Sequence, residues 1–357
     1  MIKNEILKFT AKQTMTIIEA MDKIDKNAKG ILFIVNSDNM IEGCITDGDI
    51  RRWLLKTGDL NAEVSNAMTH TPRALFVEEK SKAVNVMHRE NITALPLLNK
   101  DKTIADIVFA TKESIIKADC SDSLASVPVV IMAGGKGTRL YPYTKILPKP
   151  LIPIGETPIV ERIMDYYAKY GVNKFYMTVN YKKEMIRSYF ADIISNYNIV
   201  YVEEDMPLGT GGSIKLIEDT FDKPFFVTNC DTLILADYSD IYKYHIESGN
   251  AITIVSALKN VVVPYGVLQS GKNGEVKGME EKPKLSNLVN TGMYIINPEV
   301  VELIPANTFF HMTDLVDVVM KKCDRVGMYP VSEDSFLDMG EFSEMRRMEE
   351  KLNIADN

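Results

Sequence analysis

The sequence predicts an α/β protein in which a repeated N-terminal unit precedes a larger domain built on a mixed, largely parallel sheet. Three observations lead to this fold class. Strand and helix patterns alternate from residue 127 to residue 231, which is typical of parallel sheets with crossover helices. Shorter strands with turn signals between residues 250 and 300 indicate additions to the same sheet. A pattern of about 60 residues occurs twice before residue 118.

The N-terminal repeat relates residues 31–54 to residues 93–116, with Ile31 aligned to Ala94. In each copy an apolar strand ends in Asn, a turn with Asp follows, and a second strand leads into a helix. Units of this size bury too little surface to be stable alone, so we expect the copies to pack as a pair. The polar stretch at 119–126 predicts a linker, which gives domains at 1–118 and 127–357.

The larger domain shows apolar runs typical of strands buried on both faces. Ligands of such sheets bind at the carboxyl ends of the strands. We predict strands at 127–133, 173–180, 199–205 and 224–231, and helices at 159–171, 182–193 and 213–221.

Composition excludes several classes of function. The 357 residues carry a formal net charge of −8, whereas binding to nucleic acid or to a membrane surface favours a basic excess. The N-terminus, MIKNEILKFT, does not resemble a signal peptide, and no apolar run approaches the roughly 20 residues of a membrane span. The scattered cysteines Cys44, Cys120, Cys230 and Cys323 match no zinc or disulfide pattern. We therefore expect a cytoplasmic protein with reduced thiols.

A glycine-rich segment, AGGKGTRLYPYTKILPKPLIPIG, follows the first strand of the larger domain. Glycines at a strand end let backbone N–H groups approach an anion, and Arg139 and Lys149 can add charge-assisted bonds to phosphate oxygens. The spacing fits neither a P-loop nor a dinucleotide-binding turn. A solvated surface turn is the alternative interpretation; the simplest functional one is a loop that binds a triphosphate.

Extended through GETPI, this segment resembles the signature of the sugar-1-phosphate nucleotidyltransferases, which join a nucleoside triphosphate to a sugar 1-phosphate and release pyrophosphate. The resemblance continues in order through PLGTGGS, TNCDT, PYGVL, EEKP, NTGMY and LDMGEFSE, so it covers residues 127–345 and implies a Rossmann-like mixed sheet. Taken singly, each later motif could be a turn or a helix cap. By resemblance, the nucleotide-binding residues are Ala133, Gly134, Gly135, Gly137, Thr138, Glu204, Gly209 and Thr210.

The resemblance also assigns the residues of catalysis and of sugar binding. Asp231 and Asp338 would hold Mg²⁺, a metal that binds one or two carboxylates and completes its shell with phosphate and water. A phosphate monoester has a second pKa of about 6, so the attacking phosphate needs no general base. Accordingly, we expect His70, His88, His245 and His311 to be structural, and Cys230 to be a buried apolar residue. The catalytic residues would be Arg139, Lys149, Asp231, Lys282 and Asp338, and the sugar-binding residues Gly266, Glu281 and Asn290.

Glu204 is the residue that indicates a base. Family members that use uracil or thymine place Gln at this position before the LGT loop. A carboxylate only accepts hydrogen bonds, and guanine offers the adjacent donors N1–H and N2–H₂. Glu204 therefore favours GTP, although it could also be a surface residue in an acidic run.

The N-terminal repeat resembles a tandem pair of CBS domains, carried by EGCITDGDIRR at 42–52. In that family Thr46 and Asp49 would bind the phosphate and ribose of an adenine or guanine nucleotide. The second copy has Phe109 and Lys112 at these places, so at most one ordinary site is expected. The pair would regulate the enzyme through a nucleotide, or would serve structure and dimerisation alone. In either case we expect a homo-oligomer.

A CBS pair before a nucleotidyltransferase domain resembles a narrower group, the glucosamine-1-phosphate guanylyltransferases of bacterial legionaminic acid synthesis. Mannose- or heptose-1-phosphate guanylyltransferases, and related enzymes that use UTP, CTP or dTTP, are the alternatives. A catalytically inactive, nucleotide-sensing CBS protein is the alternative from another functional class.

Overall fold

The computed structural model describes residues 3–27, 29–90, 92–110, 122–193, 197–322, 324–340 and 342–352. Contacts divide the chain into two compact units. The first contains Met1–Ala118, Leu258–Asn287 and Pro330–Asp334, and the second contains Asp119–Ala257, Leu288–Tyr329 and Ser335–Asn357. Thus two segments that the sequence assigns to the larger domain are grouped by their contacts with the first unit.

The first unit contains two copies of one α/β arrangement. In each copy a parallel pair of strands is followed by an antiparallel pair, in the orders β1-β2-β3 and β4-β5-β6. A register shift occurs at Ile34/Val35 in the first copy and at Leu97/Leu98 in the second, the same place in the aligned repeat. The elements are α1 (Lys3–Ile6), β1 (Thr10–Ala11), α2 (Ile17–Asn27), β2 (Ile31–Val35), β3 (Ile41–Thr46), α3 (Asp47–Thr57), β4 (Leu75–Phe76), α4 (Ala83–Glu90), β5 (Ala94–Leu98) and β6 (Ile104–Phe109).

The two copies pack against each other through apolar side chains, as expected for units that are too small to fold alone. Phe33 of the first copy shares a buried cluster with Ala94 and Ile107 of the second. The rings of Phe9 and Phe109 lie 4.8 Å apart. The helix expected after β6, including Lys112, lies outside the described residues.

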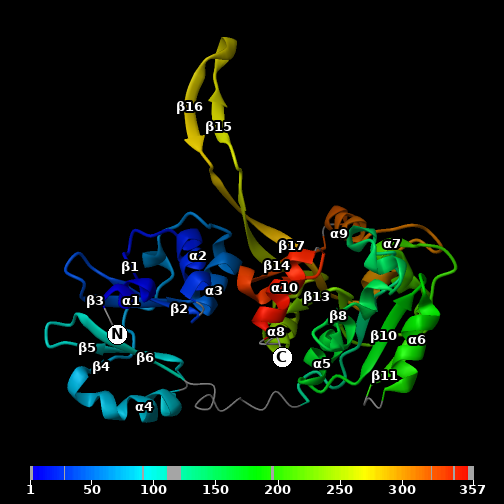
Figure 1. The fold of residues 1–357 in the computed structure, drawn as a ribbon, viewed down its shortest axis with the longest axis horizontal. Coiled ribbons are helices and arrows are strands. Elements are labelled where there is room, and N and C mark those ends of the chain that lie inside the picture. The colour runs from blue at the N-terminus through cyan, green and yellow to red at the C-terminus, as the bar shows by residue number, and fades with distance from the viewer. Residues whose placement is uncertain are drawn as a thin grey trace. The chain divides into compact units, whose positions relative to one another are not determined.

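A seven-stranded mixed sheet organises the second unit (Figure 1). Four neighbouring strands are parallel, and β17 joins them in the antiparallel direction. The fold class predicted from the sequence is therefore confirmed. In spatial order the strands are β11 (Asn198–Glu203), β10 (Lys174–Val179), β7 (Val129–Met132), β12 (Phe225–Asn229), β17 (Lys284–Ile296), β14 (Ile252–Val262) and β18 (Val326–Val331).

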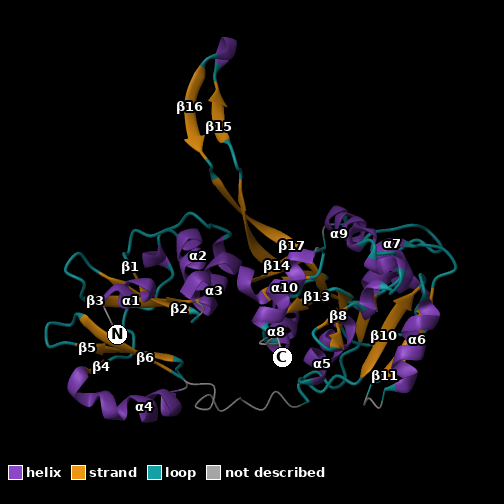
Figure 2. Ribbon diagram, in the orientation of Figure 1, coloured by secondary structure: helices purple, strands orange, loops and turns teal. Residues whose placement is uncertain are grey.

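Strand β7 is the point at which the order of the sheet reverses. The chain passes from β7 through α5 (Ile159–Ala168) to β10 and through α6 (Lys183–Asp192) to β11, and then returns to pair β12 with the other edge of β7. Figure 2 shows α6 beside the strands β10 and β11. In open α/β sheets, ligands bind at the carboxyl ends of the strands at such a reversal.

Apolar side chains cover both faces of this sheet. On one face Val130, Met132 and Tyr176 pack with Leu315 and Val319 of α9 (Met312–Lys321). On the other, Tyr167 of α5 makes edge contacts with Phe175 and Phe226. Remaining elements are α8 (Tyr238–Ser248), α10 (Phe342–Lys351), β8 (Pro153–Ile154), β9 (Thr157–Pro158), β13 (Thr232–Ile234) and β19 (Phe336–Asp338).

One predicted helix is wrong. In place of a helix over 213–221, the chain forms the short helix α7 (Gly209–Gly212) and a 3₁₀ turn at Ser213–Leu216. Ile217 is already extended and ends the turn. Three glycines in GTGG disfavour a long regular helix, and the backbone is instead held by hydrogen bonds to a distant segment.

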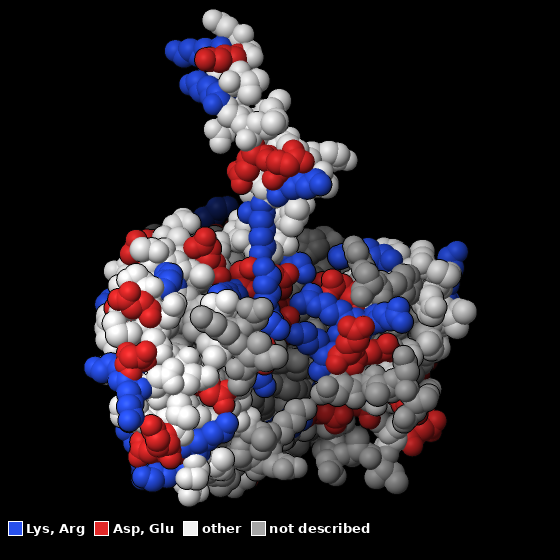
Figure 3. Space-filling view, turned by 60° about the vertical axis from the view of Figure 1, so that its left-hand side comes forward, with Lys and Arg blue, Asp and Glu red and all other residues white. Residues whose placement is uncertain are grey.

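A two-stranded hairpin, β15 (Gly266–Ser270) and β16 (Val276–Glu281), belongs to the first unit by its contacts. Acidic and basic side chains are intermixed along it, among them Lys272, Glu275 and Lys277 (Figure 3). Within the described part of the chain, no helix is both long enough and apolar enough to cross a membrane.

Candidate active site

Two adjoining cavities lie where β7, β10, β11 and β12 end, in the second unit. The larger has a volume of about 400 Å³ and the smaller about 240 Å³. Arg139, Thr210, Asn229 and Asp231 line both, so the two form one continuous site. Both open at the carboxyl end of the parallel strands, where the sequence predicts the ligand.

The glycine-rich loop forms one wall of the larger cavity. Gly134, Gly135, Gly137 and Thr138 line it, while Ala133 is buried and donates its N–H to Thr178 O at 3.0 Å. Gly134 is required for close approach, because a Cβ there would lie 2.5 Å from Glu204 Oε1. The loop therefore brings unobstructed backbone to the cavity, as a site for phosphate oxygens needs.

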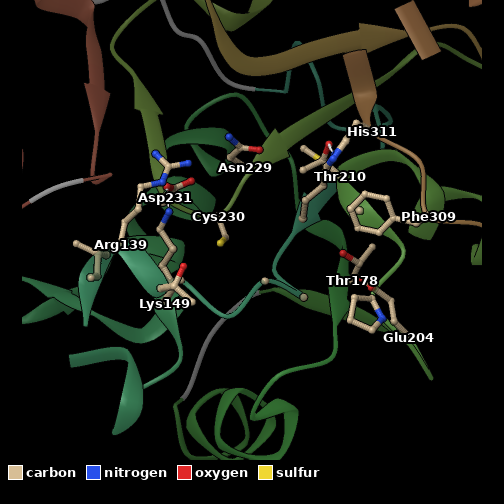
Figure 4. A pocket seen from close by; sticks show the side chains of 18 residues that line it. Arg139, Lys149, Thr178, Glu204, Thr210, Asn229, Cys230, Asp231, Phe309 and His311 are labelled. Carbon is tan, nitrogen blue, oxygen red and sulfur yellow. Dashed lines mark hydrogen bonds and ion pairs between the residues drawn. The ribbon is translucent and has the colours of Figure 1, made fainter. Parts of the chain in front are cut away.

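A compact charged cluster occupies one side of the cavity (Figure 4). Lys149 forms an ion pair with Asp231, and Arg139 lies beside them. Strand β13 pairs with β19 so that Thr232 lies opposite Asp338, and Met339 N–H donates to Asp231 O at 2.9 Å. Segments more than 100 residues apart in the sequence thus place two carboxylates side by side.

The charged groups of this cluster shift one another's pKa values. Burial and, next, the charge of Asp231 raise the pKa of Asp338 above its ordinary value, against the lowering effect of Lys149 and Arg139. Burial is the largest single influence on Lys149 and lowers its pKa, but the charge of Asp231, its hydrogen bond with Lys149 and the charges of Cys230 and Asp338 together outweigh burial, and the net direction is upward. Two adjacent carboxylates that repel each other fit a divalent cation, which removes the repulsion.

The described residues contain no group of three or more His, Cys, Asp or Glu side chains arranged to hold a metal ion. Asp231 and Asp338 would be the protein ligands of a metal ion at this place, and its other ligands would come from phosphate and water. That ligand count suits Mg²⁺, which usually binds through one or two carboxylates and substrate phosphates.

Glu204 lies at another side of the same cavity, directly after β11 (Figure 4). Its N–H donates to Val179 O at 3.0 Å, and its carboxylate accepts from Leu208 N–H at 3.1 Å. It is only 6% exposed, and burial raises its pKa despite the hydrogen bond from Leu208. Glu204 is thus a fixed, buried acceptor in the cavity wall rather than a surface residue of an acidic run.

The smaller cavity brings Asn290 to the two carboxylates. Asn290, Asp231 and Asp338 all line it. The amide of Asn290 donates to Tyr294 Oη at 2.6 Å and accepts from Gly292 N–H at 2.9 Å, which fixes its orientation. Of the predicted sugar-contacting residues, Asn290 is therefore the one that lines a cavity together with Asp231 and Asp338.

Several other predicted residues do not line either cavity. Gly266 and Glu281 face each other across the hairpin β15–β16, and Lys282 N–H donates to Tyr265 O at 3.3 Å. Their roles toward the sugar and its phosphate stay predictions. In the first unit, Thr46 and Asp49 form a capping box at the start of α3, and Asp49 also pairs with Arg52.

Sequence reasoning missed part of the cavity wall. Thr178 and Asn229 follow from their positions at strand ends, but Phe309 and His311 lie outside every motif. His311, expected to be structural, lines the cavity beside Thr210. His245, by contrast, is buried and held by Thr253 and Asn297 at 2.8 and 2.9 Å.

Cys230 lines the cavity but is not poised to react. It is 7% exposed, and burial raises the pKa of its thiol to about 12. A thiol that stays protonated at neutral pH is a poor nucleophile. This agrees with the expectation that Cys230 is a packing residue.

Comparison with known families matches both parts of the chain. The model described as Nucleotidyl transferase matches residues 128–353, and the model described as CBS domain matches residues 1–56. The structure adds that the fold of the first copy is repeated in the second.

Similar proteins match about half of the chain. A UTP--glucose-1-phosphate uridylyltransferase from Synechocystis sp. is 35% identical over 196 residues, which are 50% of this chain and 50% of the relative. A mannose-1-phosphate guanyltransferase from Saccharomyces cerevisiae is 35% identical over 184 residues, 49% of this chain and 51% of the relative. The chain thus spans about half the length of the curated relatives it matches.

Among solved structures, HddC from Yersinia pseudotuberculosis superposes with a TM-score of 0.50 and 28% identity, over 63% of this chain and 99% of that one. The matched family model covers more than half of the chain and includes every residue that lines the two cavities. The chain therefore belongs to the nucleotidyl transferase family and carries an N-terminal CBS domain.

Proposed function

We propose that this protein is a sugar-1-phosphate guanylyltransferase, which converts GTP and a sugar 1-phosphate to a GDP-sugar and pyrophosphate. One observation carries the proposal. A single cavity system combines an open glycine loop, a Lys149–Asp231–Asp338 cluster and the buried acceptor Glu204. The glycine loop and the charged cluster suit a triphosphate that is attacked at phosphorus. Glu204 suits a base with hydrogen-bond donors on its edge.

The chain's own residues act by binding and positioning. A phosphate oxygen of the sugar 1-phosphate forms a bond to the α-phosphorus, and the bond from the α-phosphorus to the oxygen bridging to the β-phosphorus breaks. Pyrophosphate then leaves with that oxygen. Arg139 and Lys149 line the cavity where this charge develops, and removal of such a group costs on the order of 10²-fold or more in rate.

Lys149 is suited to donate hydrogen bonds rather than to act as a nucleophile. Because its pKa is raised, it remains an ammonium ion at neutral pH. In the presence of substrate, its partner would change from Asp231 alone to Asp231 and phosphate oxygens. Asp231 and Asp338 would hold Mg²⁺, a cation that would supply further neutralisation of the phosphates.

The choice of GTP rests on Glu204. The relatives include one named for UTP and one named for guanyl transfer, so family membership alone does not select the base. A fixed carboxylate accepts both hydrogens from the N1–H and N2–H₂ edge of guanine. Uracil offers one N–H between two carbonyl oxygens, and these oxygens and the carboxylate repel each other because both are hydrogen-bond acceptors.

Our proposed sugar substrate is glucosamine 1-phosphate, for legionaminic acid synthesis, which follows the resemblance of the domain combination. Mannose and heptose 1-phosphates are the alternatives. Asn290, with Gly266, Glu281 and Lys282, would contact the sugar or its phosphate. For the N-terminal domain we propose a regulatory nucleotide bound through Thr46 and Asp49, and assembly as a homo-oligomer.

The test is release of pyrophosphate in the presence of Mg²⁺, with GTP, ATP, UTP and CTP each combined with glucosamine, mannose, glucose, N-acetylglucosamine and heptose 1-phosphates. The proposal predicts one dominant signal, with GTP and glucosamine 1-phosphate. A dominant signal with UTP would contradict the role of Glu204, and one with another sugar would contradict the proposed pathway. Silence in every combination, repeated with AMP, ATP and GDP as possible CBS ligands, would leave the sensing protein as the better interpretation.

A further inference from the structure

An extended segment before α9 is bound along the GTGG loop. Phe310 N–H donates to Leu208 O at 2.9 Å, and Phe310 O accepts from Gly211 N–H at 2.9 Å and from Gly212 N–H at 3.0 Å. Met312 N–H donates to Thr210 Oγ1 at 3.1 Å. The loop that follows Glu204 and the segment 308–312 thus form one rigid wall of the cavity.

Side chains alternate along this extended segment, as they do in a strand. Phe310 packs against the core of the second unit. Phe309 and His311, on either side of it, both line the larger cavity. Their rings meet edge to face with centroids 4.7 Å apart, and Phe309 is 57% exposed. A large aromatic ring is therefore held by its neighbours and yet left open on the cavity side.

The position of Phe309 suggests which part of a nucleotide it contacts. Phe310, next to Phe309, donates its N–H to Leu208 O, and Leu208 N–H donates to the Glu204 carboxylate, so Phe309 lies on the Glu204 side of the cavity. In the view of Figure 4, Arg139, Lys149 and Asp231 gather at another side. If phosphates bind the charged cluster, the base must lie toward Glu204 and Phe309. There a base would need a group that hydrogen-bonds to its edge and a group that stacks on its face. Glu204 supplies only the hydrogen-bonding group.

We propose that Phe309, supported by His311, is the stacking surface for the nucleotide base. The proposal deepens the proposed function and rests on it for the identity of the nucleotide. Every base has a π-face, so Phe309 contributes affinity and Glu204 contributes the choice among bases. A purine covers more of the ring than a pyrimidine does, so the contribution is larger for GTP. His311 acts as a positioning residue, because its ring contacts the ring of Phe309 and its Nδ1 lies 3.4 Å from Thr210 Oγ1.

The experiment compares binding of GTP with binding of inorganic tripolyphosphate, which has no base, by calorimetry in the presence of Mg²⁺. Phe309→Ala is expected to weaken GTP binding about 10-fold or more and to leave tripolyphosphate binding unchanged. Phe309→Trp should restore GTP binding. Phe76→Ala removes another exposed phenylalanine, 46% exposed and in the first unit, and should change neither affinity.

In turnover, Phe309→Ala should raise KM for GTP with little change in kcat, because the base lies away from the reacting phosphorus. Equal loss of GTP and tripolyphosphate binding would show a structural role and overturn the proposal. GTP binding like that of wild type would also overturn it. A wild-type protein that binds GTP through Phe309 but releases no pyrophosphate would refute the proposed reaction and leave this inference standing. A wild-type protein that binds none of the four nucleotides would overturn both.

Discussion

At the scale of single residues, the proposed function assigns recognition of the base and neutralisation of the phosphates to different groups. Glu204 is buried, fixed by Leu208 N–H and pressed against Gly134, so it can present acceptors but cannot move far. Lys149 and Asp231 form the complementary charged group. A rigid polar group that reads a ligand edge discriminates strongly, because a wrong ligand leaves a buried group unpaired.

Glu204→Gln should shift base preference from guanine toward uracil. The amide presents one donor and one acceptor in place of two acceptors, so it can pair with the N3–H and a carbonyl of uracil. We expect the ratio of kcat/KM for GTP to that for UTP to fall on the order of 10-fold or more. Glu203→Gln, an exposed neighbour bonded to Lys183 and Arg187, is the matched control. An unchanged ratio in Glu204→Gln would refute the assignment.

Direct transfer without a covalent enzyme intermediate is the second prediction at this scale. The thiol of Cys230 and the ammonium of Lys149 both stay protonated at neutral pH. Exchange of labelled pyrophosphate into GTP should therefore require the GDP-sugar or the sugar 1-phosphate. Exchange with GTP and enzyme alone would indicate a nucleotidyl-enzyme and contradict the single displacement.

At the scale of elements, the structure of the GTGG loop explains why it contains glycine at position 209. Gly209 has φ of +77°, and a Cβ there would lie 2.6 Å from Phe310 O. The glycine is therefore needed both for the left-handed backbone and for docking of the segment 308–312. Packing of this loop, and not helix propensity, decides the local structure.

Gly209→Ala tests this reading against a built-in control. Gly249, at the end of α8, also has positive φ, of +61°, but its Cβ would meet nothing within 4 Å. Gly249→Ala should therefore cost about 1–2 kcal/mol for the backbone alone. Gly209→Ala should lower Tm further and raise KM for GTP. Equal losses of Tm, with KM unchanged in both variants, would show that docking of the segment is unimportant.

Comparison of the predicted elements with the observed ones shows what the sequence can and cannot predict. Strands such as β7 and β10 were predictable to within a few residues, because buried apolar runs between turns have few other solutions. The repeat was predictable because the same order of apolar and turn residues occurs in both copies. The structure confirms the alignment, since the register shift at Leu97/Leu98 corresponds to that at Ile34/Val35. These are local patterns, and the fold follows from them.

The wall formed by Phe309 and His311 was not predictable in this way. It lies about 100 residues beyond Thr210 in the chain, and nothing in FFHMTD distinguishes it from an ordinary helix start. The one local signal is a cap, since His311 N–H donates to Asp314 Oδ2 at 2.7 Å. Tertiary hydrogen bonds to Leu208, Thr210, Gly211 and Gly212 bring it to the site.

At the scale of the whole molecule, the candidate site and a strongly shifted buried carboxyl group lie in different units. The two cavities belong to the second unit, whereas the carboxyl group of Asp25 belongs to the first. Burial, and next the charge of Asp47, raises the pKa of Asp25 to about 7. The atom Asp25 Oδ2 is buried without a hydrogen-bond partner, which explains why ionisation is unfavourable there.

This perturbed acid predicts the pH dependence of stability. A folded-state pKa above the unfolded value stabilises the fold at low pH, and the benefit is lost as pH rises toward about 7. Asp25→Asn should therefore raise Tm relative to wild type at pH 8, with a much smaller difference at pH 5. Asp38→Asn, in an exposed turn, should show no such pH dependence. Equal Tm values for Asp25→Asn and wild type at pH 8 would contradict this prediction.

The central claim is that the second unit catalyses nucleotidyl transfer at the cluster of Lys149, Asp231 and Asp338. The most direct measurement is Mg²⁺-dependent pyrophosphate release by wild type, Asp231→Asn and the exposed control Asp317→Asn, with folding verified by Tm. We predict that wild type and Asp317→Asn turn over equally, and that Asp231→Asn loses on the order of 10²-fold or more in kcat while folded. Turnover by Asp231→Asn near that of wild type would contradict the claim.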